Sequence, residues 1–398
     1  MSTSRPYTVR WGILATGGIA KKFAGDLLVD PATRDAQDVS HQIVAVASSS
    51  SAERAQAFIE SDLEWAAKTK VGKPHAYGSY EEMLKDEQVQ IVYVATPHSH
   101  HYANVLQCLD AGKHVCCEKP FTINAEQTKH LVDVARSKKL FLMEAMWIRF
   151  FPIVREIQRL LHEEKVLGKL HRAHSELGVH FDNATPEHRL LNPELGGGAL
   201  LDLGIYPLTW QLLTLFEDPS NERQAPSITS NVLKHPVTGV DEFTSLILNF
   251  EKGHTQGMLT ANFTVRTHSQ QHTLIQGEKG DLTVHWAPFR PTAFTITLRK
   301  NSDELGEPRT TEFDIPGGHG MFWVRSELVL CHTHRVRLTG TYCIPQEADA
   351  CSRALRDGKL EADLHPLSNS IFTMEIMDQV RASANLKYPE SIEAVHRS

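Results

Sequence analysis

The chain has 398 residues, of which 41% are apolar and 22% are charged, and it carries a formal net charge of −7. This length predicts two domains with sizeable cores, and the acidic balance excludes an electrostatic attraction to nucleic acid or to an anionic membrane. Because no apolar run reaches about 18 residues and the N-terminal stretch lacks the apolar core of a signal peptide, we expect no membrane span and a cytoplasmic location.

The first part of the chain alternates predicted strands with predicted helices. The segment YTVRWGILATGG (7–18) predicts a buried strand that runs into a tight turn, and further apolar runs predict strands at 41–49, 89–97, 113–120 and 140–147. Helical spacing predicts helices at 19–28, 51–60, 79–88, 98–112 and 124–139. This alternation is typical of βαβ units, so residues 1–146 are predicted to form a Rossmann domain, an α/β fold with a doubly wound parallel sheet.

The turn after the first strand carries a degenerate form of the dinucleotide-binding fingerprint G-x-G-x-x-G/A. Ala15 fills the first glycine position, Gly17 the second and Ala20 the third. Before a helix, such a turn lets the backbone approach a pyrophosphate. The predicted cofactor-binding residues of the turn are Ala15, Thr16, Gly17, Gly18 and Ile19. The alternative is a turn that is merely tight.

The end of the second strand decides which dinucleotide fits. An acidic residue there would bind the ribose 2′-hydroxyl of NAD, but this strand ends in Ser48, Ser49 and Ser50, with Arg54 close behind. Hydroxyls and a guanidinium can receive a 2′-phosphate, so we predict NADP as the cofactor, bound by Ser48, Ser49 and Arg54. The alternative is that Arg54 is only a solvated helix residue.

The end of the third strand carries polar residues that we expect to line the cofactor cleft, because ligands bind at strand ends in such sheets. These residues are Thr96, Pro97, His98 and His101. Three histidines lie within residues 98–101, but metal-binding pairs on a helix favour i, i+4 spacing and need a third ligand from elsewhere. We therefore predict no metal.

The segment LGGGALLDLGIYP (195–207) leads three glycines into an apolar helix that carries Asp202 and Tyr206. These two residues are four apart, so they share one face of the helix. On its own, the pair is compatible with a buried hydrogen-bonded couple or with a tyrosine whose hydroxyl reaches water.

Several segments together resemble the Gfo/Idh/MocA oxidoreductase family, and the resemblance covers nearly the whole chain. The segments are the fingerprint turn, CEKPF (117–121), MEAMWIRFFP (143–152), RLLNPELGGGALLDLGIYP (189–207) and IMDQVRASANLKYP (376–389). The nearest branch of the family oxidises D-xylose or cyclic trans-dihydrodiols with NADP. The resemblance departs at His98, where many members carry asparagine.

The resemblance implies a second domain, 147–398, with a large, mostly antiparallel open sheet. The sequence agrees, because alternating apolar residues separated by turn signals predict strands at 170–182, 228–236, 241–251, 254–266, 270–277, 280–286, 293–299 and 309–315. Such a sheet packs one face on helices and leaves the other free. In the family the free face commonly forms a dimer, so we expect a homodimer through this sheet.

Oxidation of a secondary alcohol or hemiacetal requires hydride transfer to the nicotinamide and a base for the hydroxyl proton. By resemblance, Tyr206 is the acid/base, and Lys119, with Glu118 before it, lies at the cofactor. An ammonium beside a phenol favours the phenolate, so we expect Lys119 to lower the pKa of Tyr206. Asp202 would orient the substrate or the lysine, and the Lys119–Pro120 bond would be cis. The alternative is that Lys119 is a surface lysine at a strand end.

The resemblance also predicts substrate contacts at Trp147, Arg149, Arg189 and Trp286. Packing between the domains is an equally good interpretation of Trp147. The expected reaction is oxidation of D-xylose to its lactone. The alternatives are oxidation of a cyclic trans-diol, favoured by an aromatic pocket, and an NADP-sensing regulator without turnover.

Residues 324–346 do not fit the resemblance, because the related branch runs almost directly from GMFW into EADA. Val324-Arg325 can be encoded as a splice donor, Leu338-Thr339 as a branch point and Gln346 as a splice acceptor. We therefore hypothesise a translated retained intron, or a gene-model error, in a eukaryotic gene.

The six cysteines show no disulfide framework, so we expect free thiols in a reducing compartment. Under the intron hypothesis, the following residues of the extra segment are not a zinc site: Cys331, His332, His334 and Cys343.

The intron hypothesis predicts that transcripts from the source organism join the codon of Trp323 directly to that of Glu347. Sequencing of messenger RNA across this junction measures it. Peptides covering residues 325–335 in protein purified from the natural source would contradict the hypothesis.

Overall fold

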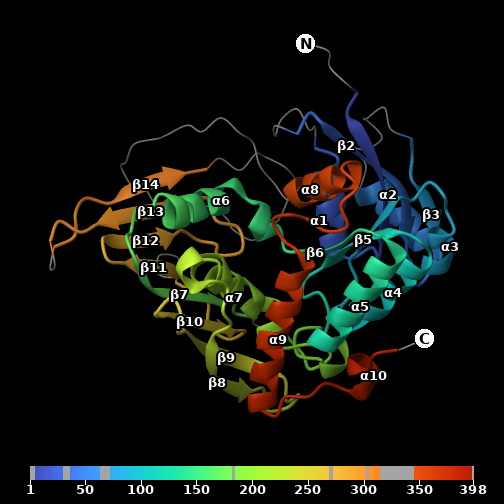
Figure 1. The fold of residues 1–398 in the computed structure, drawn as a ribbon. Coiled ribbons are helices and arrows are strands. Elements are labelled where there is room, and N and C mark those ends of the chain that lie inside the picture. The colour runs from blue at the N-terminus through green and yellow to red at the C-terminus, as the bar shows by residue number, and fades with distance from the viewer. Residues whose placement is uncertain are drawn as a thin grey trace.

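The computed structural model describes residues 5–29, 36–62, 72–181, 184–268, 272–301, 304–313 and 345–396. The chain forms two sheets, one at each side of the molecule, and helices pack between and around them (Figure 1). Of the extra segment 324–346, only the last two residues lie within the described part of the chain, where they begin a helix.

The first sheet has six parallel strands in the order β3-β2-β1-β4-β5-β6, which confirms the predicted doubly wound sheet. Its strands are β1 Tyr7–Leu14, β2 Val39–Ala47, β3 His75–Tyr77, β4 Ile91–Val94, β5 His114–Glu118 and β6 Leu142–Ala145. Its helices are α1 Gly18–Leu27, α2 Ala52–Asp62, α3 Tyr80–Leu84, α4 His98–Asp110 and α5 Ala125–Lys138. The prediction missed β3, because three residues are too few to show a period.

The second sheet has eight strands in the order β14-β13-β12-β11-β7-β10-β9-β8, and all neighbours are antiparallel except the pair β7 and β10. This confirms the predicted large, mostly antiparallel sheet. Its strands are β7 Leu170–Gly178, β8 Ser227–Lys234, β9 Asp241–Phe250, β10 Thr255–Asn262, β11 Thr273–Gly277, β12 Gly280–Val284, β13 Ala293–Leu298 and β14 Arg309–Glu312.

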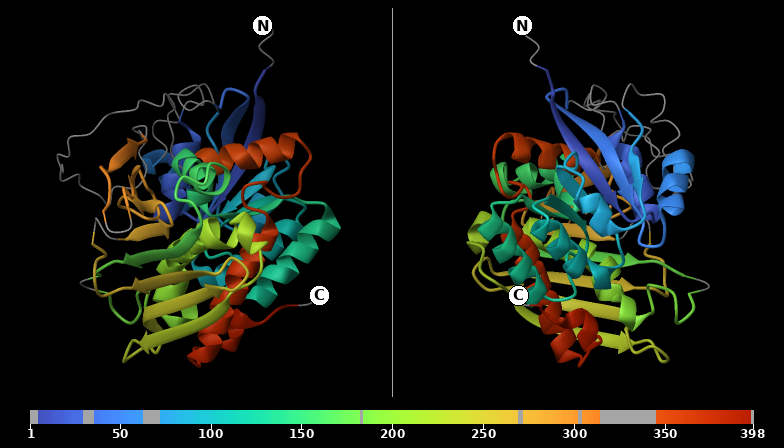
Figure 2. Two further views of the ribbon diagram at one scale, coloured as in Figure 1. Left: turned by 60° about the vertical axis from the view of Figure 1, so that its left-hand side comes forward. Right: turned by 90° about the vertical axis from the view of Figure 1, so that its right-hand side faces the viewer.

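Helices cover one face of the second sheet and leave the other open (Figure 2). Helix α6 is Pro152–Gln158, and helix α7, Ile205–Gln211, packs directly on β7 and β10. Helix α7 belongs to the helical stretch Pro193–Phe216, which is long and apolar enough to cross a membrane. Its most apolar part is entirely buried inside the protein, so the fold uses this stretch as a core helix.

The C-terminal part of the chain returns to the first domain. Helix α8, Pro345–Arg356, packs against β1, β2 and α1, and helix α9, Leu367–Ser383, runs between the domains and contacts α5, β6 and β8 (Figure 1). After helix α10, Glu390–Glu393, the amide of His396 donates to the hydroxyl of Tyr102 on α4. Residues far from 1–146 in sequence therefore complete the Rossmann domain.

Helix α8 is fixed to the first domain by ionic contacts at its inner edge. Arg353 binds both carboxylate oxygens of Asp38 at 3.0 and 2.7 Å, and Arg356 adds a third contact at 2.7 Å. One turn earlier, Asp349 lies 2.8 Å from Nε2 of buried His41. The pKa of Asp38 is lowered to about 2, chiefly by the hydrogen bond from Arg353.

We predict that Asp38→Asn lowers the free energy of unfolding by about 1 kcal/mol near neutral pH, as expected for a partly exposed ion-pair network. The carboxyl has a pKa of about 2 when folded and about 3.9 when unfolded. Its contribution is therefore complete above the unfolded value and is lost as the pH falls through this window.

Urea unfolding of both proteins at a pH of about 6 and of about 3 measures the effect, and the difference between them shrinks at the lower pH. Asp110→Asn, which removes an exposed carboxylate with one lysine partner, is the control. A constant difference at both pH values would contradict the prediction.

Candidate functional site

The turn between β1 and α1 is shaped to receive an anion. Gly17 is the N-cap of α1 and no side chain caps that helix, so its first backbone N–H groups are free to bind a ligand. A methyl group added at Gly17 or Gly18 would meet no protein atom within 4 Å. Ala15 has φ 91°, in the left-handed region that favours glycine. The fingerprint's first position thus keeps the glycine conformation although it carries alanine.

The end of β2 offers hydroxyls and one guanidinium. Ser48 is buried and its hydroxyl lies 2.9 Å from that of Ser50, whereas Ser49 and Arg54 are exposed. Ser51 caps α2 by accepting the amide of Arg54 at 3.3 Å. Both exposed groups are polar and could bind a 2′-phosphate, and no hydrogen bond or ion pair holds the Arg54 side chain within the described part of the chain.

His101 lies between the ends of two neighbouring strands. It is fully buried, with Nδ1 2.8 Å from the carbonyl of Pro120 and Nε2 2.9 Å from that of Thr96. Burial lowers the pKa of His101 to about 4, so the ring is neutral at neutral pH and donates from one nitrogen only. This placement indicates a positioning residue and argues against the predicted direct contact with the cofactor.

His98 joins the first domain to the glycine-rich segment of the second. Its Nδ1 lies 3.1 Å from the carbonyl of Gly196, and its Nε2 lies 3.5 Å from Oδ1 of Asp202. The neighbouring residues Thr96 and Pro97 are more exposed, and Thr96 receives a hydrogen bond of 3.0 Å from Asn104. Thr96, Pro97 and His98 therefore lie together at the end of β4, where the sequence predicts the cleft.

Lys119 follows β5 and points at the second domain. The Lys119–Pro120 bond is cis, as the resemblance implies. The ammonium donates to the backbone carbonyl of Asp202 at 2.7 Å, lies 3.5 Å from Oδ1 of the same residue, and is 5.0 Å from the ring centre of Tyr206. Glu118 is buried and binds the hydroxyl of Tyr93. The structure thus brings the predicted catalytic lysine, aspartate and tyrosine together.

The backbone of this helix also takes part in the contact with Lys119. Residues Leu200–Gly204 form a π-helical turn, and the α-helix α7 follows from Ile205. A carbonyl oxygen has two lone pairs, so the Asp202 carbonyl can accept the hydrogen bond from Lys119 within this helical stretch.

The glycines before this turn are required by close packing. Gly196 and Gly198 have φ of 69° and 126°, and a Cβ on Gly198 would lie 2.1 Å from Oδ1 of Asp241. The other oxygen of Asp241 accepts the amide of Leu200 at 2.6 Å, which holds the start of the helix. The glycine run is thus explained by chain geometry around Asp241, and no direct contact with a cofactor is needed to account for it.

Asp202 is a buried carboxylate shared by three basic groups. Besides its contacts with Lys119 and His98, the carboxylate accepts a hydrogen bond of 3.0 Å from Nη1 of Arg189. Burial alone would raise the pKa of Asp202, but the charges of Lys119 and Arg189 and the hydrogen bond from His98 hold it well below the usual range. Asp202 is therefore ionised at neutral pH and balances the charge around the predicted base.

Tyr206 is 5% exposed, and its electrostatic environment corrects one sequence-based expectation. Burial raises the pKa of its phenol well above 10, and the negative charges of Glu118 and Asp202 raise it further. The expected lowering by Lys119 is wrong, because burial and the carboxylates together outweigh one ammonium. Tyr206 is therefore a protonated phenol at neutral pH.

Aromatic rings extend from Tyr206 in two directions. Trp147 stacks on Tyr206 with ring centres 6.2 Å apart, and Phe289 lies 5.7 Å away on another side and contacts Trp286 at 6.2 Å. The indole nitrogens of Trp147 and Trp286 are buried without a hydrogen-bond partner. Both tryptophans therefore belong to the aromatic cluster around Tyr206, with indole N–H groups that make no hydrogen bond, and their substrate contacts stay a prediction. Phe289, which the sequence analysis missed, had no signal beyond its aromatic neighbours in HWAPF (285–289).

The two predicted arginines have different surroundings. Arg189 is half-exposed beside Asp202, and its contact with a substrate stays a prediction. Arg149 is 3% exposed and donates to Glu217 at 2.8 Å, so its guanidinium is paired inside the protein. This burial argues against the predicted substrate contact of Arg149 and indicates a role in packing.

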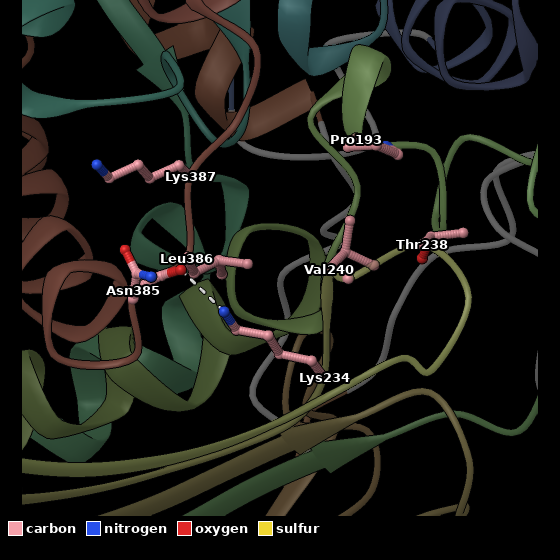
Figure 3. Close-up of a pocket in the computed structure, with 8 residues that line it drawn as sticks. Pro193, Lys234, Thr238, Val240, Asn385, Leu386 and Lys387 are labelled. Carbon is pink, nitrogen blue, oxygen red and sulfur yellow. Dashed lines mark hydrogen bonds between the residues drawn. The ribbon is translucent and has the colours of Figure 1, made fainter.

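A cavity of about 300 Å³ lies elsewhere, beside the β8–β9 turn and the end of α9 (Figure 3). It contains none of the predicted site residues, and Lys234 at its wall donates to the carbonyl of Asn385 at 2.8 Å. In the described ranges, no group of three or more His, Cys, Asp or Glu side chains could hold a metal ion. The candidate site is therefore the cluster around Asp202.

Two family descriptions match the chain. Residues 9–146 match an oxidoreductase family with an NAD-binding Rossmann fold, and residues 154–283 match the GFO/IDH/MocA C-terminal domain. The chain is 40% identical to D-xylose 1-dehydrogenase (NADP(+)) of Hypocrea jecorina, over 98% of this chain and 96% of that protein. It is 32% identical to trans-1,2-dihydrobenzene-1,2-diol dehydrogenase of Homo sapiens, over 96% of this chain and 98% of that protein.

Solved structures share the fold at lower identity. A 3-ketoreductase from Actinomadura kijaniata, in complex with NADP and TDP-benzene, superposes with a TM-score of 0.70 at 21% identity, covering 94% of this chain and 97% of that one. An aldose-aldose oxidoreductase from Caulobacter crescentus, complexed with glycerol, has a TM-score of 0.70 at 18% identity and covers 95% and 98% of the two chains.

We predict that Gly198→Ala lowers the free energy of unfolding by about 3 kcal/mol or more, because the new methyl group would collide with Asp241 in a backbone conformation closed to L-residues. Gly239→Ala is the matched control, since Gly239 has φ 75° but open space around it. Its expected cost is about 1 kcal/mol. Urea unfolding measures both, and equal costs would show that the contact with Asp241 is unimportant.

Proposed function

The chain belongs to the GFO/IDH/MocA oxidoreductase family, and from this premise we propose that it oxidises D-xylose to D-xylonolactone with NADP. The 40% identity to an NADP-dependent D-xylose 1-dehydrogenase along 98% of the chain supports the substrate. The observation that carries the proposal is the placement of Lys119, Asp202 and Tyr206 at one point between the domains.

The first domain fits NADP by the chemistry of its donors. The free N–H groups at the start of α1, beside Gly17 and Gly18, would hold the pyrophosphate, and exposed Ser49 and Arg54 would hold the 2′-phosphate. When bound, the oxidised nicotinamide supplies a hydride acceptor and a positive charge. Lys119, which follows β5, lies at the strand ends where such a ring is placed in doubly wound sheets.

Tyr206 would accept the proton of the sugar's C1 hydroxyl as the C1 hydride leaves. Burial and the charges of Glu118 and Asp202 raise its pKa and keep the phenol protonated, so positive charge beside it would favour the phenolate that acts as the base. The ammonium of Lys119, 5.0 Å from the ring, stabilises the phenolate that must form. In the reverse direction, the same phenol is well suited to donate its proton.

Asp202 would keep the basic groups in place around Tyr206, and it would not itself exchange a proton. Its ionised carboxylate fixes Lys119, His98 and Arg189 around the helix that carries Tyr206. The half-exposed Arg189 leaves donors available for substrate hydroxyls. The residues of the site thus supply a base, a charge that stabilises it and polar groups for a polyol.

A second candidate substrate is a cyclic trans-dihydrodiol, and the aromatic rings favour it. Trp147, Phe289 and Trp286 surround Tyr206 with flat apolar surface, which suits a planar ring. The burial of Arg149 removes one polar group that would have favoured a sugar. The 32% identity to dihydrodiol dehydrogenases supports the same alternative.

We further propose that the protein acts as a homodimer through the open face of the second sheet. Strands β8 and β9 expose apolar residues there, with Leu233 62% and Ile247 37% exposed. An apolar face of a long sheet that no helix covers favours association with a second copy.

We predict that the purified chain reduces NADP with D-xylose and that Tyr206→Phe lowers kcat by about a thousandfold or more, because the base is lost while the ring packing stays. The absorbance of NADPH measures the rates with D-xylose, D-glucose and a trans-dihydrodiol, in the full chain and in a variant lacking residues 324–346. NADP binding by calorimetry, unchanged in Tyr206→Phe, is the control.

Faster turnover of the dihydrodiol than of any sugar would replace the first candidate with the second. Turnover by the variant lacking residues 324–346, and not by the full chain, would support the proposed oxidation. It would also show that the extra segment prevents activity. Unchanged activity of Tyr206→Phe would contradict the proposed mechanism.

A further inference from the structure

A buried glutamate near the end of β6 reaches across to the chain that follows β5. Glu144 is 2% exposed, and it lies opposite Cys117 in this parallel pair of strands. Its Oε1 accepts the backbone amide of Phe121 at 3.0 Å. Because Phe121 is only two residues after Lys119, this hydrogen bond fixes the chain immediately beyond the lysine of the candidate site.

The other carboxylate oxygen of Glu144 is held by the C-terminal part of the chain. Ser370 in α9 donates its hydroxyl to Oε2 at 2.6 Å, and Nε2 of His365 lies 3.1 Å from the same atom. All three side chains are buried. Burial would raise the pKa of Glu144, but the contacts with His365 and Ser370 hold it below the usual value, so the group is a carboxylate at neutral pH. Glu144 therefore joins α9 to the amide of Phe121.

Other buried side chains hold the rest of the turn formed by residues 119–121, which belongs to no helix or strand. The amide of Lys119 donates to Oε2 of Glu118 at 3.1 Å, and the carbonyl of Pro120 lies 2.8 Å from Nδ1 of His101. Side chains from β5, α4 and β6 therefore fix successive backbone groups of this turn. The contact from β6 is the one that also reaches the C-terminal part of the chain.

We propose that Glu144 is a positioning residue that holds the Lys119 ammonium beside Tyr206, an inference that rests on the proposed function. The ammonium lies at the end of a flexible four-carbon chain, so its place depends on where the turn holds the Lys119 backbone. Glu144 binds that turn to α9, and α9 also packs on β8 and α7 of the second domain. The carboxylate thereby connects the backbone that carries the lysine to a helix that contacts both domains.

The test replaces Glu144 in two ways, in the full chain and in the full chain that also carries Lys119→Met. Glu144→Gln keeps an oxygen that can accept the Phe121 amide, whereas Glu144→Met keeps the volume without that acceptor. Rates of NADP reduction with D-xylose give kcat and KM for each protein.

Asp349→Leu is the matched control, because it also removes a buried carboxylate that contacts a histidine. That contact joins α8 to His41 in the first half of β2, whereas the turn follows the end of β5. Thermal unfolding of each variant checks the fold.

Glu144→Met is expected to lower kcat about tenfold or more, because a small displacement of a group that acts during the reaction slows it strongly. The KM for D-xylose should change less than about twofold, since the lysine acts on the phenolate that forms in the reaction. Glu144→Gln should restore most of kcat. In the Lys119→Met background, Glu144→Met should have no further effect on kcat, because the group that it positions is absent. Asp349→Leu should lower Tm and leave kcat unchanged.

Crystal structures add a measurement that needs no substrate. The 2.7 Å contact between Nζ of Lys119 and the carbonyl of Asp202 should lengthen beyond about 3.5 Å in Glu144→Met and stay in Glu144→Gln. If Glu144→Met does not fold, Ser370→Ala replaces it, because it removes one hydrogen bond to Oε2 and leaves the Phe121 acceptor in place. Its expected loss of kcat is smaller, about threefold, and again present only with Lys119.

An unchanged kcat or an unchanged Lys119 contact in Glu144→Met would overturn the inference and leave the proposed function intact. Equal losses of kcat with and without Lys119 would also overturn it, because that pattern indicates a general effect on the fold. If the wild-type chain oxidises neither a sugar nor a diol, the proposed function is overturned. The distance between Lys119 and Asp202 in the crystals then decides alone whether Glu144 positions the lysine.

Discussion

The buried carboxylate of Asp202 is the interaction on which the arrangement of the site depends. Lys119 and His98 approach it from the first domain, and Arg189 approaches it from the second. An unpaired charge inside a protein strongly destabilises the fold. The three basic groups and the carboxylate therefore stay together, because separating them would leave a buried charge without a partner. The two domains thereby meet at a fixed geometry beside Tyr206.

The backbone around Asp202 is shaped to make that meeting possible. Gly198 lets the chain pass against Asp241, whose carboxylate holds the start of the helix. In the helix that follows, the backbone carbonyl of Asp202 accepts a hydrogen bond from Lys119. One short segment therefore provides a carboxylate and a carbonyl that both contact Lys119, together with the phenol of Tyr206.

The sequence predicts the sheets well, because their apolar periods are long and uninterrupted. It identifies Lys119 and Tyr206 through resemblance, but it does not predict what each touches, since Lys119 and Asp202 are 83 residues apart and meet only after both domains fold. The pKa of Tyr206 is raised by burial first and then by carboxylates from several elements, which no local pattern reveals.

The central claim is that this site moves a hydride from C1 of the sugar to the nicotinamide. The most direct test is to supply D-xylose deuterated at C1, with NADP and the purified chain, and to locate the deuterium by nuclear magnetic resonance. The account predicts deuterium on C4 of the nicotinamide ring of NADPH, with slower turnover than for unlabelled sugar. NADPH formed without deuterium would contradict it, because the hydride would then come from another carbon or another substrate.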